Sequence, residues 1–75
     1  PGVRVNSWSS VLESVLMDGA EVGRNTVVNR AILDKYVRVE EGAMVGIDPE
    51  HDRERGFTVT ESGITVVAKG QLVTR

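Results

Sequence analysis

Aliphatic residues recur along the first 45 positions at intervals of five or six residues. When the chain is written in rows of 17 residues, these aliphatic residues fall into three columns. The repeat is visible directly in SVLMDGAEV and AILDKYVRV, which begin 17 residues apart. Eight residues make up the columns: Val5, Val22 and Val39; Val11, Val28 and Val45; Leu16 and Leu33.

A small residue precedes most of these aliphatic residues by two positions, as in Ser14-Val15-Leu16 and Ala31-Ile32-Leu33. In an extended strand, residues i and i+2 point the same way, so both side chains face one interior. Three short strands per repeat, stacked at strand spacing, would then enclose the columns in a three-sided coil. The pattern is typical of hexapeptide β-helices. It is incompatible with a helix, because a six-residue spacing does not keep to one helical face.

We therefore predict an all-β fold, a parallel β-helix of two to three turns over residues 1–46. Its left-handed sense is implied by the likeness to hexapeptide repeats and does not follow from the spacing. Residues 47–56 are rich in charge and contain a proline, which predicts a loop. FTVT at 57–60 and ITVVAK at 64–69 predict a β-hairpin within residues 57–75 that covers the open end of the coil.

The residue between each small and aliphatic position should point outward. Face one then carries alternating charges at Arg4, Glu21 and Arg38, whereas face two and face three carry apolar residues. Stacked apolar residues on an outer face indicate a surface that another domain or subunit covers. We expect the chain to self-associate through face two or face three. The interface candidates are Val27 and Met44 on face two, Val15 and Ile32 on face three, and Trp8 at a corner.

Composition narrows the function classes. The chain has 9 Lys and Arg against 11 Asp and Glu, which argues against a nucleic-acid partner. It has no cysteine, which excludes disulfides and thiolate metal sites and fits a cytoplasmic location. No apolar run approaches the roughly 18 residues of a membrane span. The chain begins with Pro1, so we read its 75 residues as one domain from a longer protein.

Few residues carry candidate chemistry. His51 is the only histidine, so a three-histidine zinc site is excluded, and no serine or cysteine stands at a spacing typical of a nucleophile for it. The alternating acidic residues at 48–54 lack the glycine and terminal glutamate of a calcium loop, so we expect solvated carboxylates paired with Arg53 and Arg55. Lys35, Lys69 and these two arginines would form an anion pocket if the fold brought them together.

Several motifs together are more specific than the repeat. VNSWSSV at 5–11, AILDK at 31–35, GIDPEHDRERGFTV at 46–59 and GITVVAKG at 63–70 resemble the C-terminal tail of bacterial glucose-1-phosphate adenylyltransferases. The resemblance covers nearly the whole chain. The loop around DPEHDR is similar to the actinobacterial type.

This resemblance implies a parent enzyme of glycogen biosynthesis, a nucleotidyltransferase that converts ATP and glucose 1-phosphate to ADP-glucose and pyrophosphate with Mg²⁺. It further implies a homotetramer whose N-terminal catalytic domain, with its ATP-binding site, lies outside these residues. No catalytic residue, metal ligand or cofactor is then expected here. The left-handed β-helix would serve in oligomerisation and allosteric regulation. Lys35 and Lys69 match positions that contact phosphorylated effectors, and Arg53 and Arg55 are candidates by proximity.

Two alternatives stay open from the residues. A fragment of a hexapeptide acyltransferase would share the coil, although such enzymes use more turns to bind an acyl carrier. A purely structural β-helix without a ligand would share it as well. The residues that precede this chain in a longer protein would discriminate among these possibilities.

Overall fold

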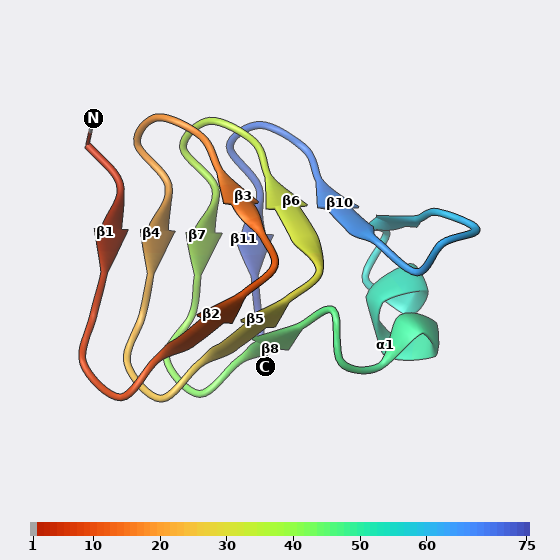
Figure 1. The fold of residues 1–75 in the computed structure, drawn as a ribbon, viewed down its shortest axis with the longest axis horizontal. Coiled ribbons are helices and arrows are strands. Elements are labelled where there is room, and N and C mark those ends of the chain that lie inside the picture. Colours follow the sequence, from red (N-terminus) through yellow and green to blue (C-terminus); the bar gives the residue numbers. More distant parts are fainter. Residues whose placement is uncertain (1) are drawn as a thin grey trace.

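The computed structural model describes residues 2–75, and most of its regular structure is strand. Very short strands follow one another with tight turns between them, and a single short helix interrupts their sequence (Figure 1). In chain order the elements are β1 (Arg4–Val5), β2 (Ser10–Leu12), β3 (Val15–Leu16), β4 (Glu21–Val22), β5 (Val27–Asn29), β6 (Ala31–Leu33), β7 (Arg38–Val39), β8 (Met44–Val45), α1 (Pro49–Glu54), β9 (Thr58–Val59), β10 (Thr65–Val67) and β11 (Leu72–Val73).

The strands form three sheets that the chain visits in rotation. The sheet orders are β1-β4-β7-β11, β2-β5-β8 and β3-β6-β10-β9, and every pairing is parallel except that of β9 with β10. Val5 pairs with Val22 and Val22 with Val39, so the first predicted column lies in one file. The mostly-strand content and the 17-residue stacking that the repeat predicts are confirmed.

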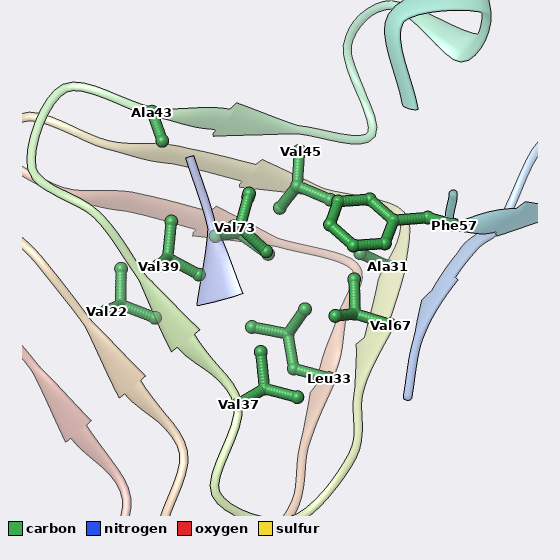
Figure 2. Packing of buried hydrophobic residues seen from close by; sticks show 11 residues of the cluster. Val22, Ala31, Leu33, Val37, Val39, Ala43, Val45, Phe57, Val67 and Val73 are labelled. Atoms are coloured by element: carbon green, nitrogen blue, oxygen red, sulfur yellow. The ribbon is translucent and has the colours of Figure 1, made fainter. Parts of the chain in front are cut away.

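The inner positions of the three sheets meet in one core. Figure 2 shows Val22, Leu33, Val45 and Val67 pointing into the same interior from different sheets. These side chains are completely buried, and each contributes on the order of 1.5–3 kcal/mol through burial. The alanines at 20, 31 and 43 are buried beside them, which explains the small residue two positions before each aliphatic one. The narrow interior has no room for two large side chains per strand.

The charged segment contains a helix where the composition predicts a loop over 47–56. Asp48 caps helix α1, because its side chain accepts hydrogen bonds from the backbone N–H groups of Glu50 (3.1 Å) and His51 (3.3 Å). Pro49 occupies the first turn, where a missing N–H costs nothing. The sequence Asp48-Pro49 could therefore have predicted the start of a helix. The helix itself could not be recognised from its hydrophobic pattern, because six residues are too few to show a helical period.

The coil resumes after this helix, which the sequence pattern alone did not predict. The antiparallel hairpin of β9 and β10 is present, as expected. However, β10 also pairs in parallel with β6, and β11 pairs in parallel with β7. Val67 lies beside Leu33 and Val73 beside Val39, so β10 completes a third turn and β11 begins a fourth. Strand β9 lies at the outer edge of the third sheet.

A buried ion pair fastens helix α1 to the coil. Asp52 is only 1% exposed, and its carboxylate accepts hydrogen bonds from the Gly46 N–H (2.9 Å) and the Thr65 hydroxyl (2.7 Å). It also pairs with Arg55, whose guanidinium donates to the Met44 carbonyl (2.8 Å). The predicted ion pair thus exists, but Asp52 is buried and not solvated.

The corners of the coil require left-handed backbone conformations. Trp8, Asn25 and Gly42 occupy the same corner in successive turns, with φ values of 65°, 55° and 79°. Glycine and asparagine tolerate this region, whereas a tryptophan there carries strain. The Trp8 indole is also 83% exposed, so the conformation gains little burial in return.

We expect Trp8→Asn to raise the free energy of unfolding by about 0.5–1 kcal/mol, because asparagine relieves the left-handed strain. Thermal denaturation followed by circular dichroism measures the change. Trp8→Phe keeps an aromatic residue at the same φ and should show no gain. An asparagine variant less stable than the parent chain would mean that the indole makes a stabilising contact.

Candidate functional site

One corner of the coil brings the two predicted lysines together. It joins the third sheet to the first, between β6 and β7 and again between β10 and β11. The Tyr36 N–H donates to the Asp18 carbonyl (3.1 Å), and the Gly70 N–H donates in the same way to the Lys35 carbonyl (2.9 Å). Asp18, Lys35 and Lys69 therefore occupy equivalent positions in three successive turns. Lys35 and Lys69 are both exposed.

Tyr36 adds an aromatic ring that sequence reasoning missed. Its column holds Gly19 in the turn before and Gly70 in the turn after, all three with positive φ. The ring lies against Gly19, where an added Cβ would overlap it. The Lys69 Nζ lies 6.0 Å from the ring centroid, at the outer limit of a cation–π contact. Tyr36 could have been recognised from the sequence, because it is a large residue in a column that otherwise contains glycine.

Acidic residues share this corner with the lysines. Asp18 stacks in the same column, and the Asp34 carboxylate accepts a hydrogen bond from the Lys35 N–H (2.7 Å). Two ammonium groups and two carboxylates leave the corner without a net charge. Groups from outside this chain would be needed to hold a phosphorylated ligand tightly.

The two arginines lie away from the lysine corner, in and next to helix α1, which Figure 1 shows apart from the turns that join β6 to β7 and β10 to β11. Arg53 is exposed and pairs with Glu50 at 2.9 Å. The Arg55 side chain is only 10% exposed, and it donates to the Thr74 carbonyl (2.6 Å) as well as to Met44 and Asp52. Its guanidinium also lies 5.1 Å from the Phe57 ring centroid. These contacts give Arg55 a structural role, and anion binding by either arginine stays a prediction.

The predicted interface residues lie on the outside of the coil. On face three, Val15 pairs with Ile32 and Ile32 with Val66, so three apolar residues stack without a break. On face two, Ser10 precedes Val27 and Met44 and interrupts the stripe. Val15, Met44 and Trp8 are exposed. That another domain or subunit covers these surfaces stays a prediction.

Face one carries the expected charge ladder. The Glu21 carboxylate lies 3.7 Å from Arg4 and 3.5 Å from Arg38, and all three are solvent-accessible. A hollow of about 270 Å³ lies beside this ladder, and the carboxylates of Glu40 and Glu41 line it together with Glu21 and Arg38. Its lining is unsuited to an anion and contains neither Lys35 nor Lys69.

No metal site is formed by the residues that the structure describes, since no three His, Asp or Glu side chains gather in them. His51 lies in helix α1 and is partly buried. Residues 2–75 contain no helix with the length and apolar character required to cross a bilayer.

Comparison with known proteins gives a family assignment. The family described as "GlmU-like, C-terminal hexapeptide" matches residues 1–67, which is most of the chain. The chain belongs to this hexapeptide family. Membership agrees with the stacked parallel strands and supports a β-helix as the architecture.

Curated relatives of this hexapeptide chain are similar over nearly all of it. The glucose-1-phosphate adenylyltransferase of Parafrankia sp. is 61% identical over 70 residues, which are 93% of this chain and 17% of the relative. That of Arthrobacter sp. is 61% identical over 71 residues, or 95% of this chain and 15% of the relative. That of Bifidobacterium adolescentis is 58% identical over 73 residues, which are 97% of this chain and 18% of the relative. The chain thus corresponds to a small C-terminal part of these enzymes.

Proposed function

We propose that this chain is the C-terminal oligomerisation and allosteric regulatory domain of a glucose-1-phosphate adenylyltransferase. The sequence identity of 61% over 93% of the chain supports the proposal. The parent enzyme would convert ATP and glucose 1-phosphate to ADP-glucose and pyrophosphate in the cytoplasm. A separate N-terminal domain would hold ATP and Mg²⁺, since the chain spans only 17% of the relative's length. The similarity also favours this function over a hexapeptide acyltransferase.

The parent would assemble as a homotetramer, and two structural features support a role of this domain in assembly. Apolar residues stack on the outside of face three, which is expensive to leave in water. The coil also holds its neighbouring turns in parallel register, which keeps these apolar residues aligned on one surface. The left-handed sense of the β-helix is part of the same proposal, and the hexapeptide pattern supports it.

The regulatory part of the proposal rests on the lysine corner. Lys35 and Lys69 come from adjacent turns, so their ammonium groups can reach the same phosphate. The Tyr36 ring lies near the Lys69 ammonium and supplies a flat surface beside it. The acidic neighbours Asp18 and Asp34 mean that the parent's other domain would have to complete the site. Arg53 and Arg55 are weaker members of this proposal because they lie elsewhere.

In the complete enzyme, we expect Lys35→Ala and Lys69→Ala each to raise the effector concentration for half-maximal response about tenfold, because one charge-assisted hydrogen bond is lost. Titration of phosphorylated sugars and AMP during ADP-glucose synthesis measures the response. Arg24→Ala is the matched control, since Arg24 is an exposed cation at a different corner. Regulation that is the same in both lysine variants as in the parent would remove these residues from the site.

A further inference from the structure

Face three carries an unbroken apolar stripe on the outside of the coil. Val15, Ile32 and Val66 stack in three successive turns, and Val15 is 55% exposed. Met17 extends the surface beside Val15 and is exposed as well. On face two the corresponding stripe begins with Ser10, and Asn29 stands beside Leu12. Face three is therefore the surface that gains more from being covered.

On both borders of face three, the first two turns carry charges of opposite sign. At the border where the strands begin, Glu13 stands in the first turn and Arg30 in the second, both in left-handed corner conformations. The Arg30 guanidinium donates to the Ser62 carbonyl (2.5 Å) within the chain, and the residue is exposed. At the border where the strands end, Asp18 stands in the first turn and Lys35 in the second. Each border thus carries an acid in the first turn and a base in the second.

This arrangement is self-complementary for one packing geometry. Two copies can be packed face to face about a two-fold axis that is parallel to the strands and passes between the first and second turns. Val15 of one copy then meets Ile32 of the other, Glu13 meets Arg30, and Asp18 meets Lys35. The axis produces each of these two charge pairs twice, so all four border contacts join opposite charges.

The competing two-fold axis, parallel to the stack of turns, brings opposite borders together. Glu13 would then face Asp18, and Arg30 would face Lys35, so every border contact would join like charges. Electrostatic complementarity therefore selects the first geometry over the second.

We propose that face three binds a second copy of this chain, with the two copies antiparallel along their coils and the Val15–Ile32 stripe at the centre. The inference rests on the assembly part of the proposed function and names its surface and geometry. The principal extents of 29 × 21 × 20 Å limit the contact to a small interface. Association of the chain by itself is therefore expected to be reversible and concentration-dependent.

Sedimentation of the 75-residue chain over a range of concentrations tests the surface. We expect Ile32→Lys to lower the association constant at least about tenfold, because it places a charge in the apolar centre. Met44→Lys on face two is the matched control and should leave association unchanged. Circular dichroism of both variants shows whether the strands are retained. A folded Ile32→Lys variant that still associates like the parent chain would overturn the proposal.

Charge reversal tests the geometry. We expect Glu13→Arg and Arg30→Glu each to weaken association about tenfold, because each reverses a contact that occurs twice. The double variant should restore association to within about twofold, since it exchanges the two members of the pair. No restoration, or stronger association in a single variant, would exclude this axis.

Other outcomes separate this inference from the proposed function. If Ile32→Lys still associates and Met44→Lys does not, the interface lies on face two, and the proposed assembly role would stand. A chain that stays monomeric at all concentrations would overturn both the interface and the assembly role. The effector response of the Lys69 variant is measured separately and would be unaffected by either result.

Discussion

Asp52→Ala is expected to lower the free energy of unfolding by about 3–5 kcal/mol, because the substitution leaves a buried guanidinium without its counter-ion. Asp52 is also the acceptor for the Gly46 N–H and the Thr65 hydroxyl, so two further donors lose their partner. Arg55 would remain at the end of the coil, where it donates to the carbonyls of Met44 and Thr74. Urea denaturation followed by circular dichroism measures the loss.

The control for this prediction is an ion pair of the same spacing on the same helix. Glu50 and Arg53 are three residues apart, as Asp52 and Arg55 are, but both are well exposed. Glu50→Ala should therefore change the free energy of unfolding by no more than about 0.5 kcal/mol. Similar losses in the two variants would mean that Asp52 does not fasten helix α1 to the coil.

Gly46→Ala is expected to lower the free energy of unfolding by about 3 kcal/mol or more. Gly46 has a φ of 85°, and an added Cβ would overlap the carbonyl oxygen of Asn29 in the preceding turn. Relief requires movement of the backbone, which would also disturb the hydrogen bond from the Gly46 N–H to Asp52. Thermal denaturation measures the change, and it should be accompanied by loss of strand signal at lower temperature.

Gly70→Ala separates the steric effect from the backbone conformation. Gly70 has a similar φ of 75°, but an added Cβ there meets nothing within 4 Å. The variant should lose only about 1 kcal/mol, the cost of a left-handed conformation for alanine. Equal losses at the two glycines would show that conformation alone, and not the contact with Asn29, requires glycine at position 46.

The coil could be predicted from the sequence because one simple constraint governs it. A narrow interior admits one aliphatic residue per strand, so Val22, Val28 and Leu33 and their counterparts recur at fixed intervals. The last turn was missed because 22 positions separate Val45 from Val67, whereas five separate Val11 from Leu16. Val67 and Val73 nevertheless stand two 17-residue periods after Leu33 and Val39, which was a usable signal.

The candidate site could be predicted only in part. The pattern places Lys35 on a corner, but Lys69 joins it only because the coil resumes after helix α1. Tyr36 could have been recognised from its place among glycines. The burial of Asp52 could not, because alternating acidic and basic residues have the same composition in a solvated loop and in a packed helix. Only the three-dimensional contacts show that the Asp52 carboxylate is buried and links helix α1 to the coil, whereas other carboxylates of this segment lie on the surface.

The interruption between β8 and β10 is longer than the usual connection by one repeat, yet the strands on either side keep their register with the turn below. Since each turn of such a coil contacts only its neighbours, foreign sequence can be spliced at one corner without altering the others. The stacked turns thus form a scaffold that does not depend on the segment between β8 and β10. This corner is therefore a natural place to exchange or shorten sequence when such domains are engineered.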